Sequence, residues 1–216
     1  MSYEEESVDP TTNKVVLIGN EGVGKTSIFL RFKTDRFIEP TSQTRYQAEH
    51  YKEWNVAKTP VKMTLFDTAG MERYTSTIPP TYFRNAKQIL MVYSIDNPDS
   101  ISDAIMWTEN FSLARLGESS NLMTPILVGN KCDLEDSRDV SIQRIQETAR
   151  LCGISEEDVF EISVSTGEGF EKMFDKLALK MTKSENGFKR QKTIRAGSDV
   201  RNNKQKSITC SYCNKE

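Results

Sequence analysis

GNEGVGKTS, residues 19–27, is the stretch that decides the fold of this chain, because it fits the pattern G-x-x-x-x-G-K-[ST]. The apolar run KVVLI, residues 14–18, precedes it and predicts a buried strand, and IFLRF, residues 28–32, can continue as a helix. A strand, a glycine-rich loop and a helix in this order cradle phosphate, since the backbone N–H groups of the loop point at the anion. The residues that we expect to line the phosphate are Glu21, Gly22, Val23, Gly24, Lys25, Thr26 and Ser27.

Two side chains of this loop have the chemistry that a nucleotide phosphate requires. Lys25 supplies a positive charge to the β- and γ-phosphates, and the hydroxyl of Thr26 can bind Mg²⁺. The alternative is a strand-to-helix turn that happens to carry glycines, which the flanking strand and helix disfavour.

The charge of the chain is divided unevenly along its length. The 216 residues suggest one folded domain with tails, and the net charge is −2. Residues 1–182 have a net charge of −8, whereas residues 183–206 have a net charge of +6. An acidic body with a basic tail excludes a nucleic-acid-binding domain and predicts a tail that meets an anionic surface. We expect a disordered acidic arm over 1–12, a folded domain over 13–182 and a disordered basic tail over 183–216.

Membrane insertion and secretion are not expected from the sequence. No apolar run reaches the length of about 18 residues that a membrane span needs, and the start MSYEEE, residues 1–6, lacks the features of a signal peptide. The four cysteines show no disulfide or zinc spacing in the body of the chain, which fits a reducing compartment. We interpret Cys132 and Cys152 as ordinary buried residues.

Strand and helix patterns alternate from residue 15 onward, which predicts an α/β fold with a mostly parallel sheet covered on both faces. The expected strands are 15–18, 49–56, 61–66, 88–95, 125–129 and 159–162, and the expected helices include 25–32, 100–116, 141–152 and 169–180. We expect 49–56 and 61–66 to form an antiparallel hairpin with its turn near residues 58–60, and Ser141 to cap the helix that follows it. Ligands of such sheets bind at the carboxyl ends of the strands.

The motif DTAG, residues 67–70, follows one of the expected strands. Asp67 can hold Mg²⁺ through water, and the N–H of Gly70 can meet a γ-phosphate. Taken alone the motif is weak, because D-x-x-G arises easily by chance.

Two further motifs, each directly after an expected strand, indicate which nucleotide base the site would bind. In NKCD, residues 130–133, Asp133 can accept hydrogen bonds from the N1–H and the exocyclic amine of guanine, a donor pair that adenine lacks. The stem of Lys131 can pack on the ring face. In EISVS, residues 161–165, the N–H of Val164 can point toward the guanine oxygen. Each motif alone could be a polar strand end, but the three in this order behind the phosphate loop make coincidence improbable.

The chain resembles the Ras superfamily of small GTPases over roughly residues 13–182, and the Rab branch most. The segments that carry the Rab resemblance are YFRNA at 82–86, DTAGMERY at 67–74 and VGNKCDL at 128–134. The resemblance implies a P-loop NTPase small G-domain, with a six-stranded, mostly parallel sheet flanked by about five helices, that binds GTP and GDP with Mg²⁺ and hydrolyses GTP.

Spacing from Lys25, compared with the family pattern, implies roles for residues whose chemistry alone does not suggest them. Phe37 follows Lys25 by twelve residues, where an aromatic ring stacks on the guanine edge, and Thr44 follows it by nineteen, where a threonine binds Mg²⁺ and the γ-phosphate. Asn130 and Ser163 fall at nucleotide-contacting positions. The positions that the resemblance assigns to hydrolysis are Lys25, Thr44, Gly70 and Met71.

Three departures from the family pattern bear on activity. Met71 replaces the glutamine that orients the attacking water, and a thioether cannot donate a hydrogen bond. Glu21 places a carboxylate in the phosphate loop, where it repels the γ-phosphate unless it turns outward, and where it would crowd an arginine finger or pair with it. RYQAE, residues 45–49, replaces the usual effector-binding segment. We therefore predict slow hydrolysis; the alternatives are that a partner supplies the missing group at Met71 and that Glu21 is harmless.

The chain ends in a pair of cysteines, Cys210 and Cys213. Cys213 is fourth from the end, but Asn214, Lys215 and Glu216 do not fit a C-a-a-X signal. The pair resembles a prenylated Rab terminus with wider spacing, and two prenyl groups plus a basic stretch would anchor a protein stably. The alternative is two unmodified cysteines.

The resemblance thus implies a monomeric, Rab-like GTP-binding switch for intracellular vesicle trafficking, on the cytoplasmic face of an intracellular membrane with a cytosolic pool. Its expected partners are an exchange factor, a GTPase-activating protein, effectors and Rab escort or GDI-like chaperones, with no nucleic acid. The alternatives are a GTP-bound binding module that hardly hydrolyses, favoured by Met71 and Glu21, and a Ras- or Rho-type signalling GTPase, which residues 82–86 disfavour.

Overall fold

The computed structural model describes residues 13–39, 48–68, 83–114 and 125–182, apart from the side chains of residues 110 and 112–114. The acidic arm over 1–12 and the basic tail over 183–216 lie outside these residues and stay predictions.

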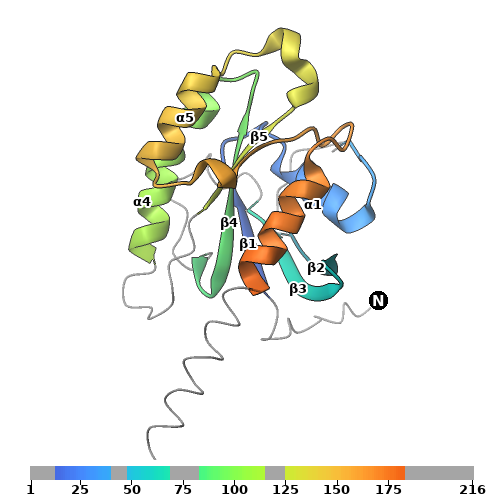
Figure 1. The fold of residues 1–216 in the computed structure, drawn as a ribbon. Helices are drawn as coiled ribbons and strands as arrows, with labels where there is room; N and C mark the ends of the chain where they lie inside the picture. The colour runs from blue at the N-terminus through green and yellow to red at the C-terminus, as the bar shows by residue number, and fades with distance from the viewer. Residues whose placement is uncertain (1–12, 40–47, 69–82, 115–124, 183–216) are drawn as a thin grey trace, which may run out of the picture. The chain divides into compact units, whose positions relative to one another are not determined.

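A six-stranded sheet in the order β2-β3-β1-β4-β5-β6 forms the centre of the fold (Figure 1). Only β2 and β3 pair antiparallel, and the other neighbours pair parallel. This confirms the predicted α/β class and the mostly parallel sheet with a hairpin at one edge. The strands are β1 Asn13–Ile18, β2 Ala48–Val56, β3 Thr59–Asp67, β4 Ala86–Ser94, β5 Ile126–Asn130 and β6 Val159–Glu161.

Helices cover both faces of the sheet, as the sequence predicts. They are α1 Lys25–Thr34, α3 Asp99–Ser102, α4 Ala104–Ala114, α5 Ile142–Leu151 and a helix over residues 170–182, with 3₁₀ turns η2 Cys132–Ser137 and η3 Glu156–Asp158. Ser141 caps α5 as expected, because its hydroxyl accepts a hydrogen bond of 3.2 Å from the N–H of Arg144. Within the described residues, no helix has both the length and the apolar character that crossing a bilayer requires.

Alternating side chains of β1 divide the core into two layers. Val15 and Leu17 face the layer covered by α1 and the helix of residues 170–182, whereas Val16 and Ile18 face the layer covered by α4 and α5 (Figure 1). All four are fully buried. The sheet is thus held on both faces, which fixes the carboxyl ends of its strands as a rigid platform.

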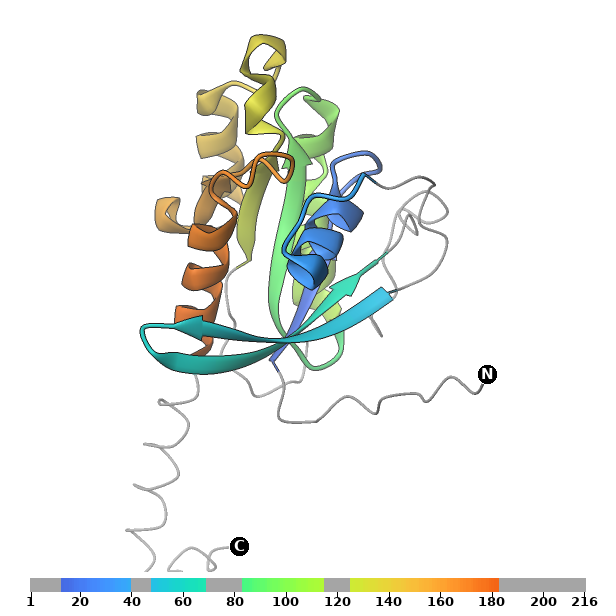
Figure 2. The same ribbon diagram turned by 90° about the vertical axis from the view of Figure 1, so that its right-hand side faces the viewer.

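The β2–β3 hairpin turns slightly earlier than the expected residues 58–60. Ala57 and Lys58 form the two-residue turn with φ of 48° and 64°, the left-handed pair that matches the twist of a hairpin. Figure 2 shows the hairpin reaching the lower end of the helix of residues 170–182. Trp54 of the hairpin packs on Phe174 of this helix, with ring centroids 5.1 Å apart.

The helix expected over residues 100–116 is broken near its start, so that prediction was wrong in this detail. Asp103 separates α3 from α4. Its carboxylate accepts a hydrogen bond of 2.9 Å from the amide of Asn20. The break therefore ties the start of α4 to the phosphate loop.

Candidate nucleotide site

The predicted site segments follow β1, β3, β5 and β6, at the carboxyl ends of strands that share one edge of the sheet (Figure 1). The loop of residues 19–24 joins β1 to α1 there. This is the arrangement that the strand-loop-helix pattern predicts.

The phosphate loop depends on Gly24 at the start of α1. Its φ is 97°, and a Cβ on this residue would lie 2.2 Å from Nδ2 of Asn130, so no other residue fits without displacing that amide. The first turn of α1 contains no acidic residue. The N-terminus of α1 therefore keeps its positive end available to an anion.

Lys25 is buried inside the curve of this loop. Its ammonium donates hydrogen bonds of 2.7 and 2.8 Å to the carbonyl oxygens of Gly19 and Asn20. Only 6% of its surface is exposed. A lysine charge held here is desolvated and close to the loop that would surround the phosphates, which suits the role that the sequence predicts.

Thr26 and Asp67 meet although they are far apart in the chain. The Thr26 hydroxyl donates to Oδ2 of Asp67 over 2.7 Å, and Asp67 is fully buried at the end of β3. The next residue, Thr68, donates from its hydroxyl to the carbonyl of Leu17 over 2.9 Å and so ties the end of β3 to β1. A hydroxyl and a carboxylate in this position are the hard oxygen ligands that Mg²⁺ prefers, so the residues fit the expected metal.

Asn130 joins the phosphate loop to the segment after β6. Its Nδ2 donates to the carbonyl of Val23 over 2.9 Å, and its Oδ1 accepts from the N–H of Val164 over 3.2 Å. Asn130 is 3% exposed. The Val164 N–H, for which we predict contact with a guanine oxygen, thus has a protein partner in this structure. The carbonyl of Val164 also accepts a hydrogen bond of 2.7 Å from Arg31.

Lys131 and Asp133 lie on the turn that follows β5. Lys131 has a φ of 68°, and its ammonium lies 3.1 Å from Oδ2 of Asp96. Burial opposes ionisation of Asp96, but hydrogen bonds from Ser94 and Lys131 outweigh it and lower the pKa of this carboxyl below its ordinary value. Asp133 is exposed on η2, as a residue that must reach a base requires.

Ser163 orders the segment after β6 from within the core. It is fully buried, and its hydroxyl accepts a hydrogen bond of 3.0 Å from the N–H of Thr166. Its own N–H donates to the carbonyl of Glu168 over 3.0 Å. The segment that would approach the base is therefore a defined turn.

Several predicted site residues are exposed or lie outside the described part of the chain. Phe37 is 43% exposed, and Glu21 and Gly22 are also exposed. The predicted roles of these residues stay predictions. The site residues Thr44, Gly70 and Met71 and the two terminal cysteines, Cys210 and Cys213, lie outside the described residues.

Three residues with structural roles at the site escaped the sequence analysis. Asp96 pairs with Lys131, Arg31 holds the Val164 carbonyl, and Arg138 joins two carboxylates near β6. Asp96 gave a usable signal, because it is an acidic residue just beyond the end of β4, at the ligand-binding edge. Arg31 gave none, since Val164 is distant in sequence, and for Arg138 only the local partner Glu135 was within reach of a sequence pattern, since Glu161 is distant.

The comparisons with known proteins agree with this geometry. The model of the Ras family matches residues 14–183 of the chain. The chain is 32% identical to the Ras-related protein RabG2 of Dictyostelium discoideum over 193 residues, which cover 88% of this chain and 92% of that protein. It is 33% identical to the Ras-related protein Rab-10 of Caenorhabditis elegans, over 79% of this chain and 83% of that protein. It is also 32% identical to the GTP-binding protein ypt2 of Schizosaccharomyces pombe, over 82% and 87%.

The family match spans most of the chain, and the alignments with Rab-named relatives cover most of the length of those proteins. The fold has the six-stranded, mostly parallel sheet that the resemblance to small GTPases implies. The chain therefore belongs to the Ras family of small GTPases and is Rab-like within it.

Proposed function

We propose that this protein is a Rab-like molecular switch that binds GTP and GDP, hydrolyses GTP slowly and recruits effectors in intracellular vesicle trafficking. The observation that carries the proposal is the bridge made by Asn130, which bonds to Val23 of the phosphate loop and to Val164 of the base segment. One buried amide thereby sets the spacing between the part of the site that would hold phosphates and the part that would hold a guanine. The names of the relatives, among them a GTP-binding protein, support the choice of ligand.

The phosphate side of the proposal uses residues that are already close together. Lys25 would contact the β- and γ-phosphates, and Thr26 and Asp67 would hold Mg²⁺, whose charge offsets that of the phosphates when it is bound. We assign Thr44 as a further ligand of the metal and the γ-phosphate, and the N–H of Gly70 as a γ-phosphate donor. GTP would order the segments around these two residues and so create an effector surface.

The base side of the proposal rests on hydrogen-bond chemistry. Asp133, exposed on η2, would accept from the N1–H and amine of guanine. Lys131 would pack its stem on the ring while Asp96 fixes its ammonium. Phe37 would stack on the guanine edge, and the buried Ser163 would shape the turn that presents Val164.

Met71 and Glu21 set the proposed rate. A methionine cannot orient the attacking water by donating a hydrogen bond, and the Glu21 carboxylate would repel the γ-phosphate and crowd an arginine finger or pair with it. The protein would therefore remain GTP-bound for long periods. These residues also favour the second candidate, a GTP-bound binding module that scarcely hydrolyses its ligand.

Single-turnover hydrolysis of preloaded GTP tests the proposal and separates these candidates. The wild type is compared with Met71→Gln and Glu21→Gly, and Met123→Gln serves as the control because Met123 lies outside every nucleotide motif. We expect the Met71→Gln variant to hydrolyse at least about tenfold faster than the wild type, since the glutamine positions the water. Equal rates would show that another group positions the water. No hydrolysis by any variant would favour the binding module.

The proposed location follows from the tail. Prenyl groups on Cys210 and Cys213, next to the basic segment 183–206 with a net charge of +6, would give the two signals that stable anchoring needs. An escort or GDI-like chaperone would maintain the cytosolic pool, and an exchange factor and a GTPase-activating protein would act on the monomer. Imaging of a tagged protein, with and without Cys210→Ser and Cys213→Ser, checks this. Localisation at the plasma membrane would favour a Ras- or Rho-type signalling role instead.

A further inference from the structure

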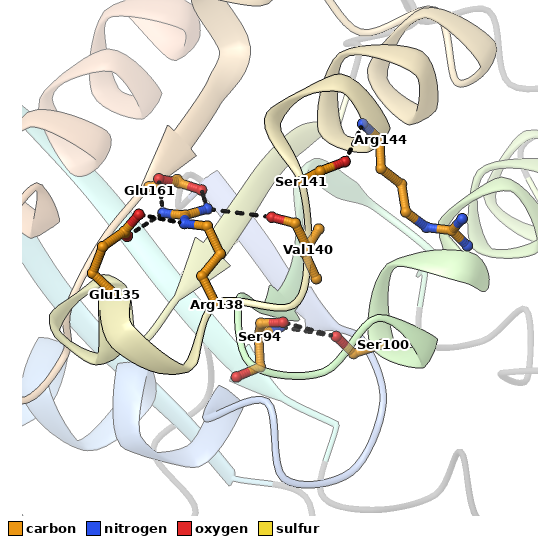
Figure 3. Close-up of polar contacts among 8 residues, drawn as sticks. All are labelled: Ser94, Ser100, Glu135, Arg138, Val140, Ser141, Arg144 and Glu161. Carbon is orange, nitrogen blue, oxygen red and sulfur yellow. Dashed lines mark hydrogen bonds and ion pairs between the residues drawn. The ribbon is translucent and has the colours of Figure 1, made fainter.

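Arg138 is bonded to two carboxylates at once (Figure 3). Its Nη1 and Nη2 donate to Glu161 over 2.7 and 2.8 Å, and its Nε and Nη2 donate to Glu135 over 2.8 and 2.7 Å. Its side chain is 16% exposed. Both pairs have the two-pronged geometry that makes arginine–carboxylate contacts strong and directional.

The two carboxylates belong to the two segments that the proposed function assigns to the base. Glu135 lies on η2, two residues after Asp133, and Glu161 ends β6, three residues before Val164. We infer that Arg138 is a positioning residue that holds the turn of Asp133 and the segment of Val164 at the separation at which both can flank one guanine base. The inference rests on the proposed function and deepens it, because it adds a group that determines base specificity without touching the base.

Apart from the bonds of Arg138, backbone hydrogen bonds at its two ends hold the turn that carries Asp133. No residue of η2 is buried, so apolar packing does not hold it in place. Its first residue is tied to the core by one backbone bond of 3.1 Å, from the N–H of Cys132 to the carbonyl of Ile162. At the other end of the turn, the N–H groups of Asp139 and Val140 donate to the carbonyl of Ile95. The side chain of Arg138 adds the bonds that tie Glu135 to Glu161.

Arg138, Glu135 and Glu161 together form a clamp between the two base segments. This clamp is anchored more firmly at Glu161 than at Glu135. Glu161 pairs with Gly129 of β5, which pairs with Tyr93 of β4, so the three residues form one row across the sheet. A Cβ at Gly129 would lie 2.5 Å from the Tyr93 ring, so the tyrosine covers the glycine. Burial and then the neighbouring charge of Glu161 raise the pKa of Tyr93 well above its ordinary value, so the tyrosine stays neutral. Glu161 is 28% exposed, whereas Glu135 is 66% exposed.

Base selectivity distinguishes a positioning role from a merely structural one. Inosine diphosphate is GDP without the exocyclic amine, so it can donate only one of the two hydrogen bonds to Asp133. If the clamp aligns Asp133, its loss lowers the affinity for GDP more than that for inosine diphosphate. A residue that only stabilises the fold would lower both affinities by the same factor.

The experiment measures dissociation constants of GDP and inosine diphosphate, with Mg²⁺, for the full chain and for Arg138→Gln. Arg138→Lys retains the charge but not the fork, and Arg144→Gln is the control, since Arg144 is exposed on α5 and its guanidinium donates to the Ser102 hydroxyl over 2.9 Å. We expect Arg138→Gln to weaken GDP binding roughly tenfold, the equivalent of one charge-assisted hydrogen bond, and to reduce the preference for GDP over inosine diphosphate. Arg138→Lys should restore part of this preference, and Arg144→Gln should leave it unchanged.

Unchanged selectivity in folded Arg138→Gln would overturn the inference, whether or not both affinities fall together. If that variant does not fold, Glu135→Gln provides the test, because Glu135 is largely exposed and the bonds from Arg138 to Glu161 remain. A smaller loss of the same preference supports the inference, and no loss overturns it. Failure of the wild type to bind GDP would refute the proposed function itself, which the arginine variants cannot do.

Discussion

The phosphate end and the base end of the candidate site are held by different kinds of contact. At the phosphate end, Lys25 and Asp67 are almost completely buried and hydrogen-bonded within the protein. At the base end, Asp133 is exposed, and Lys131 is held by a partly exposed ion pair with Asp96. Asn130 is the buried link between the two.

This difference predicts how substitutions divide between folding and binding. Removing a buried polar partner leaves a desolvated group behind, so changes at the phosphate end should lower stability and affinity together. Ion pairs that are partly open to solvent contribute little to stability, so changes at the base end should alter nucleotide retention while the fold persists.

Asn130→Ala should have the largest effect, because it deprives the Val23 carbonyl and the Val164 N–H of their buried partner. We expect the free energy of unfolding to fall by about 3 kcal/mol, measured by urea denaturation at a fixed GDP concentration. Asn55→Ala, at an exposed position of β2, is the matched control and should change stability by less than about 0.5 kcal/mol. Equal losses of unfolding free energy in the two variants would refute the claim that the buried link at Asn130 contributes more to stability than an exposed position does.

Asp96→Ala should have an intermediate effect that is confined to nucleotide retention. Without its partner, the Lys131 side chain is free to leave the base, and we expect GDP to dissociate a few times faster while unfolding changes by less than about 1 kcal/mol. Stopped-flow release of a fluorescent GDP measures the rate. Asp136→Ala, an exposed acidic residue of η2, is the control and should match the wild type. Loss of stability on the scale of Asn130→Ala would contradict the comparison.

The same pair predicts a dependence on pH. Because the pKa of Asp96 is lowered in the folded protein, its carboxylate contributes at neutral pH, and the contribution is lost only as the pH falls through that lowered value. The dissociation rates of wild type and Asp96→Ala should therefore differ from neutral pH down to mildly acidic pH and converge only in stronger acid. Convergence near neutral pH would show that the carboxylate does not hold Lys131.

The smallest expected effect concerns the reactivity of Cys132, whose thiol lies in the acidic surroundings of the base end. Burial, and then the charges of Glu168, Asp133 and Glu161, raise the pKa of its thiol to about 11. The reactive thiolate is thus scarce at neutral pH. Alkylation of Cys132, followed by peptide mass spectrometry with Cys132→Ser as the control, should stay slow until the pH approaches that value. Rapid labelling at neutral pH would contradict the described environment.

Local patterns predicted those parts of the molecule whose partners are local. The apolar run over residues 14–18 and the alternation of strands and helices sufficed to predict the sheet. The motifs sufficed to predict where Lys25 and Asp67 lie along the fold, while their roles stay predictions. Motif spacing could do this because carboxyl ends of parallel strands converge whatever the connecting loops contain.

Long-range partners were beyond prediction. The break at Asp103 depends on Asn20, and the clamp on Arg138 depends on Glu161, neither of which lies nearby in sequence. The hairpin turn was misplaced because Ala57 and Lys58 adopt left-handed conformations that their residue types do not advertise. In the first two cases the pairing exists only once the sheet has brought distant segments together.

The central claim is that Asp133 selects guanine while the phosphate loop holds the phosphates, and one substitution tests it most directly. Xanthine carries an oxygen in place of the guanine amine, so an asparagine amide can donate where the Asp133 carboxylate must accept. Dissociation constants of GDP, xanthosine diphosphate and ADP should show a strong preference of the wild type for GDP. In Asp133→Asn this preference should shift to xanthosine diphosphate, while ADP binds weakly to both proteins. Equal binding of ADP and GDP by the wild type, or an unchanged preference in Asp133→Asn, would contradict the account.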